Sequence, residues 1–209
     1  MAIDFTLSPE LEAIRARVRT FIDEVVRPGE ARIGDPDEIE RDEYLRILFG
    51  MRDRAKEEGL WLPHMPEEWG GMGLGHVELA MVQAEAAKTY YGPFVMNCQA
   101  PDEGNMHTLL HWGTDEQKEK YLRPLCEGRA MSCFAMTEPE VAGSDPTLIR
   151  TTAVQDGDEW VINGHKWFIS NARRASFAIL IARTEDDPDL PQAANTAFIV
   201  DIPSEGWNR

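Results

Sequence analysis

The stretch CFAMTEPEVAGSD, residues 133–145, marks the point where the hydrophobic pattern of the chain changes. Before it, apolar residues recur every three to four positions, as in helices, and after it they recur with the period of two that is typical of β-strands. The stretch itself begins like a strand and ends in small residues. A simple turn needs only Pro or Gly, and does not require Thr137 at a strand end or Ser144 behind Gly143. We therefore expect a ligand to approach the backbone closely here.

The residues before this stretch predict a helical domain. Ser8 is placed to cap a first helix, and Pro28-Gly29 is predicted to end it. Thr114 and Gln117 have the spacing of a capping box, which predicts the start of another helix. The further helices are expected over residues 37–58, 76–90, 102–112 and 114–127.

The residues after position 130 predict a β-domain. Asn163-Gly164 lies between two β-rich runs and is the strongest short-range hairpin signal in the chain. Another turn is expected at Asp156-Gly157. Strands are also predicted over residues 130–138, 177–183 and 196–202. The predicted fold class is α+β: an N-terminal all-helical domain, residues 1–130, followed by an incomplete antiparallel β-barrel domain, residues 131–209.

The segment KWFIS, residues 166–170, is predicted to be the outgoing strand of the hairpin at Asn163-Gly164. Alternation along a strand places Lys166, Phe168 and Ser170 on one face and the other two residues on the opposite face. A ring with a hydroxyl two residues away suits a planar ligand with a polar rim. The alternative, that Phe168 packs inside the barrel and Ser170 is merely exposed, stays open at this point.

The composition narrows the class of protein. The chain has 209 residues, 43% of them hydrophobic, and a formal net charge of −16. This acidic balance argues against a nucleic-acid surface, which needs clustered Lys and Arg. Cys98, Cys126 and Cys133 form no CxxC pair and predict reduced thiols, which suits a cytoplasmic protein. No secretory pattern opens the chain, and no apolar run approaches the roughly 20 residues of a membrane span.

Three further patterns are assigned ordinary roles. GGMGLG, residues 70–75, follows no strand and lacks the third glycine spacing of a dinucleotide fingerprint. His107 and His111 lie four apart on a predicted helix with no evident third ligand, so no metal site is predicted. Arg173 and Arg174 could meet a ligand phosphate, although a solvated surface is the default interpretation.

Four segments, in order along the chain, resemble the acyl-CoA dehydrogenase flavoprotein family. They are PEEWGGMGL, GTDEQKEKYLRPLCEG, CFAMTEPEVAGSD and INGHKWFISNA. The usual family forms of the last two are TEPxAGSD and INGxKxxITN. The chain departs from these forms in three ways: TEPEVAGSD is one residue longer, Phe168 replaces the usual Trp, and Ser170 replaces the usual Thr.

The resemblance implies an FAD cofactor whose isoalloxazine ring lies against the β-domain. The cofactor-binding residues that it implies are Phe134, Met136, Thr137, Gly143, Ser144, Phe168 and Ser170. Among these, Thr137 is expected to bond the pyrimidine edge of the ring, and Ser170 to lie near flavin N5. Gly143 and Ser144 are expected at the pyrophosphate, with Ser144 also binding the pantetheine side of the substrate.

The implied activity is FAD-dependent α,β-dehydrogenation of an acyl-CoA thioester. In this family the catalytic base is a Glu from a C-terminal helical domain that these 209 residues do not include, and Glu103 and Glu138 do not match it. No catalytic residue is therefore predicted here, and the chain is expected to be an oxidoreductase fragment, inactive alone, that lines the flavin and the substrate.

The expected setting is cytoplasmic fatty acid metabolism. The expected partners are the acyl-CoA, an electron-transferring flavoprotein or similar acceptor, and further copies of the chain or a completing C-terminal segment. Two alternatives stay open: an oxygen-using acyl-CoA oxidase or flavin monooxygenase of the same fold, and a noncatalytic flavin- or acyl-CoA-binding subunit.

Overall fold

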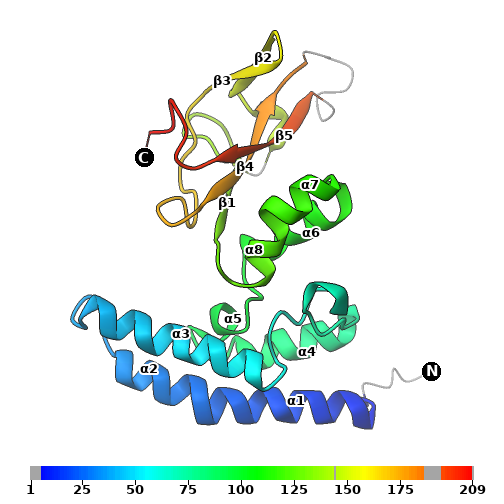
Figure 1. Cartoon of the computed structure of the whole chain (residues 1–209), viewed down its shortest axis with the longest axis vertical. Coiled ribbons are helices and arrows are strands. Elements are labelled where there is room, and N and C mark those ends of the chain that lie inside the picture. The colour runs from blue at the N-terminus through cyan, green and yellow to red at the C-terminus, as the bar shows by residue number, and fades with distance from the viewer. Residues whose placement is uncertain (1–5, 144, 186–193, 209) are drawn as a thin grey trace. The chain divides into compact units, whose positions relative to one another are not determined.

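The computed structural model describes residues 6–143, 145–185 and 194–208. The chain divides into two compact units, Met1–Glu103 and Gly104–Arg209, whose elements are labelled in Figure 1. The contacts thus divide the chain at residue 103, whereas the pattern of the sequence changes near residue 130; the domain boundary placed at 130 stays a prediction. Among the described residues, none of the helices is both long enough and apolar enough to cross a membrane.

The described part of the first unit is built from helices. They are α1 (Pro9–Phe21), α2 (Arg27–Ile33), α3 (Arg41–Glu57), α4 (His76–Ala86) and α5 (Gly92–Val95). The start of α1 is confirmed, because the Ser8 side chain accepts a hydrogen bond from the amide of Leu11. The apolar stripe of the first helix is buried at Val18 and Phe21.

The predicted end of the first helix at Pro28-Gly29 is wrong. A π-helical turn over Ile22–Val26 joins α1 to α2, and Figure 1 shows the two helices as one continuous rod. Pro28 lies in the first turn of α2, where its missing N–H is tolerated. A Cβ on Gly29 would lie 2.2 Å from the sulfur of Met51, so this glycine permits close packing and does not end the helix.

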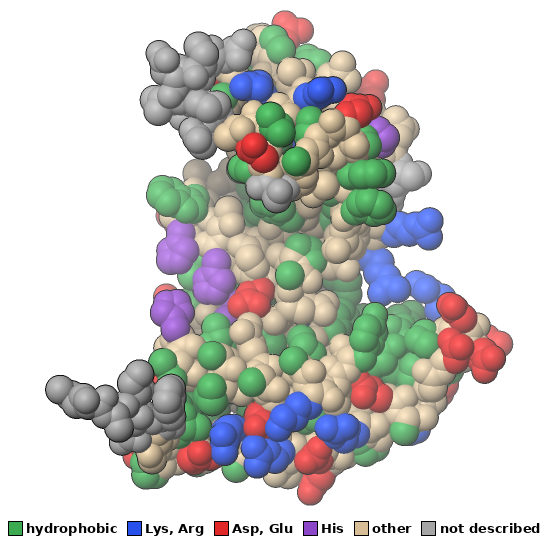
Figure 2. All heavy atoms as spheres, turned by 180° about the vertical axis from the view of Figure 1, so that it is seen from behind, with side chains coloured by type: hydrophobic (Ala, Val, Ile, Leu, Met, Phe, Trp, Pro, Cys, Tyr) green, Lys and Arg blue, Asp and Glu red, His purple; other side chains and the backbone are tan. Residues whose placement is uncertain are grey.

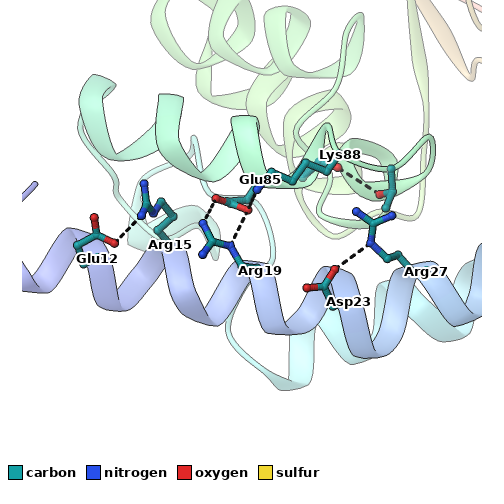
Figure 3. A network of polar contacts seen from close by, with 9 residues as sticks. Glu12, Arg15, Arg19, Asp23, Arg27, Glu85 and Lys88 are labelled. Carbon is teal, nitrogen blue, oxygen red and sulfur yellow. Dashed lines mark hydrogen bonds and ion pairs between the residues drawn. The ribbon is translucent and has the colours of Figure 1, made fainter. Parts of the chain in front are cut away.

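A buried carboxylate links α1 to α4 within this unit. Arg19 Nη2 donates to Glu85 Oε1 at 2.7 Å, and Lys88 pairs with the same carboxylate (Figure 3). The hydrogen bond from Arg19 lowers the pKa of Glu85 to about 2, with Lys88 adding to the effect against the penalty of burial. Figure 2 shows acidic and basic side chains interspersed over the surface of the helical unit.

The second unit combines short helices with one sheet. Its described elements are α6 (Asp102–Trp112, which begins just before the division), α7 (Asp115–Gln117), α8 (Arg123–Cys126), β1 (Ser132–Ala135), β2 (Thr152–Asp156), β3 (Glu159–Asn163), β4 (Phe177–Arg183) and β5 (Asn195–Asp201). The predicted capping box is confirmed: Thr114 and Gln117 each accept the other's backbone N–H at the start of α7. A π-helical turn over Lys118–Leu122 joins α7 to α8.

The sheet is mixed and not purely antiparallel. β4 pairs in parallel with β1, antiparallel with β5, and in parallel with β2 at a single position; β2 and β3 form an antiparallel pair. The α+β content is as predicted, but the wholly antiparallel arrangement is wrong because long connections return the chain in the same direction from β1 and β2 to β4. The sheet is not closed among the described strands, so a barrel is not confirmed.

The hairpin predicted at Asn163-Gly164 is also wrong. β3 ends at Asn163, and residues 164–170 contain no strand. The turn expected at Asp156-Gly157 is confirmed, because it joins β2 to β3 with Gly157 in the left-handed region at φ +62°. Gly164 allows the backbone to pass close to Thr151, because a Cβ at residue 164 would lie 2.1 Å from Thr151 Oγ1. The glycine therefore marks a close approach between segments and not a hairpin.

One core cluster of the second unit packs on one face of the sheet, while Phe177 and Ile179, at the alternate positions of β4, are buried on the other. The buried members of that cluster are Cys133, Ala135, Ala153, Ala175, Ala178, Leu180, Ala182 and Ile202. The side-chain amide of Asn105 on α6 donates to Ser132 Oγ at 2.8 Å and to the carbonyl of Cys133 at 3.2 Å. These bonds hold α6 on β1 and fix the strand from which the CFAMTEP segment emerges.

Candidate functional site

The two segments singled out in the sequence lie side by side in the second unit. The amide of Trp167 donates to the carbonyl of Thr137 at 3.0 Å. The ammonium group of Lys166 donates to the carbonyl of Met136 at 2.9 Å and to Glu138 Oε1 at 2.8 Å. The end of the CFAMTEP strand is thus joined through both backbone and side chain to the segment that follows β3.

Glu138 is the centre of this junction. Its side chain is 4% exposed, and that of Lys166 is 9% exposed. The amides of Arg150 and Thr151 donate to its two carboxylate oxygens at 2.8 and 2.9 Å, and the Thr151 hydroxyl donates at 2.6 Å. One buried carboxylate therefore holds three stretches of chain around Glu138, Thr151 and Lys166.

The electrostatics of the pair follow from this geometry. Burial by itself raises the pKa of Glu138, but the hydrogen bonds from Lys166, Thr151 and the two backbone amides outweigh burial and lower it to about 2. Burial also lowers the pKa of Lys166, which Glu138 opposes by favouring the charged ammonium. Glu138 is thus a fixed anion and a poor proton acceptor at neutral pH.

Phe168 is presented to solvent from an unusual backbone conformation. Its φ is +52°, a left-handed value that a bulky residue rarely adopts, and the residue is 82% exposed. Its ring lies 4.3 Å, centroid to centroid, from that of Trp167, which is 40% exposed. Ile169 packs against the core and Ser170 is exposed. The predicted strand alternation is wrong, because Phe168 projects from an irregular turn and not from the face of a strand.

The other predicted site residues come from the CFAMTEPEVAGSD stretch. Phe134 lies on β1 and is 37% exposed, while Met136 and Thr137 follow it and are half-buried. A Cβ on Gly143 would lie 3.0 Å from Thr137 Cγ2, so Gly143 packs directly over Thr137. Ser144 lies outside the described residues. The geometry brings Thr137, Gly143 and the 166–168 segment together, and their roles toward a flavin stay predictions.

Sequence reasoning missed the residues that hold the site together. Lys166 was placed on a ligand-facing strand face, and Glu138 was considered only as a catalytic base. The two lie 28 residues apart in the chain, and neither local spacing nor periodicity links them. The available signal was chemical: one Glu inside the first motif and one Lys inside the second are opposite charges in segments expected to adjoin.

A cavity of about 360 Å³ lies beside the same segment. It is lined by Lys166, Trp167 and Phe168 together with core residues such as Leu180 and Val200 and the chain around Trp207. Neither Thr137 nor Gly143 lines it. We therefore take the exposed surface bearing Thr137, Gly143 and Phe168 as the candidate site.

The residues at this surface fit a planar, polar-edged group such as a flavin. They offer an exposed ring at Phe168, a hydroxyl at Thr137 and a glycine that lets a ligand approach the backbone. The side-chain Nδ2 of Asn171 is buried and has no hydrogen-bond partner among the described residues. A buried donor left unpaired costs about 1–3 kcal/mol, so an acceptor on a bound group would satisfy it.

Comparison with known proteins defines the class. The family model of the acyl-CoA dehydrogenase N-terminal domain matches residues 8–129, and that of the middle domain matches residues 133–208. The chain therefore belongs to the acyl-CoA dehydrogenase family. The two matches follow one another in the same order as the four segments of resemblance in the sequence.

Individual relatives agree with the family. Human acyl-CoA dehydrogenase family member 11 is 37% identical over 84% of this chain, which covers 23% of that protein. The Mycobacterium tuberculosis protein named "Probable acyl-CoA dehydrogenase FadE2" is 35% identical over 96% of this chain and 50% of its own length. A glutaryl-CoA dehydrogenase from Mycobacterium smegmatis, solved in complex with FADH2, matches 97% of this chain and 48% of its own with TM-score 0.71 and 26% identity. The chain thus spans half or less of these relatives.

Proposed function

We propose that this chain forms the flavin- and substrate-lining part of an FAD-dependent enzyme that introduces a 2,3 double bond into an acyl-CoA thioester. The observation that carries the proposal is the junction of the two motif segments, which joins Thr137 to Trp167 by a 3.0 Å hydrogen bond and presents Phe168 beside them. When bound, FAD supplies the hydride acceptor for such a reaction. The chain's own residues hold and orient that group.

Each residue predicted at the site has a definite role in this proposal. The ring of Phe168 lies against the face of the flavin, the hydroxyls of Thr137 and Ser170 bond its polar edge and N5, and Phe134 and Met136 line it. The roles proposed for Gly143 and Ser144 are binding of the pyrophosphate, and for Ser144 also binding of the pantetheine arm.

The base that removes the proton from Cα is proposed to lie outside these 209 residues. Glu138 is buried, accepts four hydrogen bonds and has a pKa of about 2, so it does not serve as a base at neutral pH. Glu103 has a raised pKa through burial but accepts hydrogen bonds from Gln83 in the first unit. We expect the chain alone to bind ligands without turnover.

The cellular setting is part of the same proposal. Cys98, Cys126 and Cys133 are buried thiols, a state that suits the reducing cytoplasm proposed as the setting. Fatty acid metabolism, an electron-transferring flavoprotein or similar acceptor, and assembly into a homo-oligomer follow from family membership and are proposed with it.

The test is flavin binding and its reduction by substrate. The whole native protein that contains this chain is titrated with FAD, and acyl-CoAs of different chain lengths are then added without oxygen. We expect bleaching of the flavin absorbance by at least one acyl-CoA, and about tenfold weaker FAD binding in Phe168→Ala, the loss expected when roughly 1.4 kcal/mol of contact is removed. A wild-type protein that binds no FAD would contradict the proposal. Rapid reoxidation of the bleached flavin by air would indicate an oxidase instead.

A matched control separates the site from general effects of losing a ring. Trp112, on α6, is 86% exposed and is not part of the site. Trp112→Ala removes a similarly exposed aromatic side chain from the same unit. We expect this variant to bind FAD as the wild type does.

A further inference from the structure

The Glu138–Lys166 ion pair is buried, unlike the ion pairs of the protein surface. Both side chains are at least nine-tenths buried, and the carboxylate is surrounded by donors. A buried ion pair is weak evidence for stability, because a well-packed apolar pair often serves as well. Where such a pair persists, specificity of local structure is the hypothesis to examine.

The contacts of the pair show which local structure is specified. Lys166 donates to both Glu138 and the carbonyl of Met136, so its ammonium group fixes the chain on either side of Thr137. The next residue, Trp167, donates its amide to Thr137 itself. Thr137 is thus held by its neighbours before and after it and by its own carbonyl.

The same contacts fix the turn that carries Phe168. A non-glycine residue at φ +52° persists only when its surroundings hold it there. On the N-terminal side, Lys166 and Trp167 are bonded to the 136–138 segment, and on the C-terminal side Ile169 packs into the core. Both ends of the turn that carries Phe168 are therefore anchored.

We propose that Glu138 and Lys166 are positioning residues that set the orientation of Thr137 and Phe168 toward the flavin. This inference rests on the proposed function for the identity of the bound group. The pair contacts no ligand in this account and acts only through the backbone of residues 136–138 and 166–168. Its loss is expected to alter the environment and affinity of the flavin beyond any change in global stability.

The test uses the double variant Glu138→Gln/Lys166→Met in the whole native protein. It removes both charges at nearly constant shape and leaves no unpaired buried ion. We expect the FAD dissociation constant to rise about tenfold, a loss of roughly 1.4 kcal/mol. We also expect a shifted visible spectrum of the bound flavin. Hydrogen exchange of the Trp167 amide should become at least about tenfold faster, because the Thr137 carbonyl that accepts its hydrogen bond would no longer be fixed.

The matched control is Lys120→Met/Asp201→Asn, which removes an ion pair from the same unit. Its atoms lie 2.9 Å apart, and both side chains are more than half exposed. We expect FAD affinity, flavin spectrum and Trp167 exchange to stay at the wild-type values. Glu138→Asp, which keeps the charge but shortens the reach, is expected to shift all three measurements in the same direction as the double variant.

The outcomes separate this inference from the proposed function. A double variant with wild-type affinity, spectrum and Trp167 exchange, whatever its melting temperature, overturns the inference. If that variant does not fold, the same result for Glu138→Asp overturns it. If the wild type binds no FAD, the proposed function fails, while the exchange of the Trp167 amide still shows whether the pair holds the turn.

Discussion

Each unit contains a buried carboxylate that is paired with cationic side chains, and the two carboxylates have different structural roles. Glu85 links α1 to α4, and its partners Arg19 and Lys88 have side chains 47% and 46% exposed. Glu138 joins three irregular segments, and its partner Lys166 is 9% exposed. Hydrogen bonds lower the pKa of both carboxylates to about 2, from two cations at Glu85 and from one cation, a hydroxyl and two backbone amides at Glu138, so this value alone does not distinguish them.

The difference lies in what the carboxylates hold. The helices α1 and α4 already have their own backbone hydrogen bonds, so Glu85 adds to elements that exist without it. The segments around Glu138 have no sheet or helix to satisfy their amides, and the carboxylate does this instead. The ion pairs of Glu85, whose partners are half-exposed, therefore add to the stability of helices that form without them. The buried ion pair of Glu138 instead specifies the conformation of irregular segments.

The largest effect is expected from Lys166→Met alone. It leaves Glu138 as an uncompensated buried anion, which typically costs about 3–5 kcal/mol of unfolding free energy. The double variant Glu138→Gln/Lys166→Met is expected to recover only part of that loss, because the amide nitrogen of Gln cannot accept the hydrogen bond that Arg150 or Thr151 donates to a carboxylate oxygen. Urea unfolding followed by circular dichroism measures both. A loss below about 1 kcal/mol for the single variant would mean that water reaches the carboxylate, and the contrast with Glu85 would disappear.

Acid should weaken the second unit through Glu138. Its pKa is lowered from 4.5 to about 2 in the folded chain, so its contribution is present above the unfolded pKa and is lost as pH falls from about 5 to 2. The expected loss is roughly 3 kcal/mol. The free energy of unfolding is measured against pH for the wild type and Glu138→Gln. Parallel curves over this range would contradict the assignment.

Gly164→Ala tests whether the junction depends on close packing. The added Cβ would lie 2.1 Å from Thr151 Oγ1 and 2.6 Å from Thr151 Cβ, so one segment must move. We expect a loss of about 2 kcal/mol, as for overpacked cores. Gly104→Ala is the control, because a Cβ there has no neighbour within 4 Å among the described residues and favours α6. Equal stability of the two variants in thermal unfolding would exclude a tight approach at residue 164.

The smallest effect is expected from Glu85→Gln in the first unit. The amide keeps the shape, and the half-exposed partners return to water, so the loss should be about 1 kcal/mol. It should shrink further in 1 M salt, where exposed charges are screened. Urea unfolding at low and high salt measures this. A loss as large as that of Lys166→Met, and insensitive to salt, would remove the distinction between the two carboxylates.

Prediction from the sequence succeeded where the cause is local. Ser8 and the Thr114–Gln117 capping box act within one turn of helix, and the turn at Asp156-Gly157 follows from a residue that tolerates positive φ. It failed at Pro28-Gly29, where packing on Met51 and a π-helical turn override the local stop signal. At Asn163-Gly164 the pattern predicted a hairpin turn, but the glycine is required for another reason. A side chain at residue 164 would collide with Thr151, which lies 13 residues earlier in the chain.

The sequence by itself determined the helical and β-rich parts of the chain, the family resemblance and the residues expected at the site, because these depend on side-chain chemistry and on spacing along the chain. Only the tertiary structure decided that β4 runs parallel to β1, that Phe168 projects from a left-handed turn, and that Glu138 and Lys166 hold that turn against Thr137. The physical reason is that hydrogen bonding and desolvation in irregular chain depend on neighbours in space, which the period of a sequence does not encode.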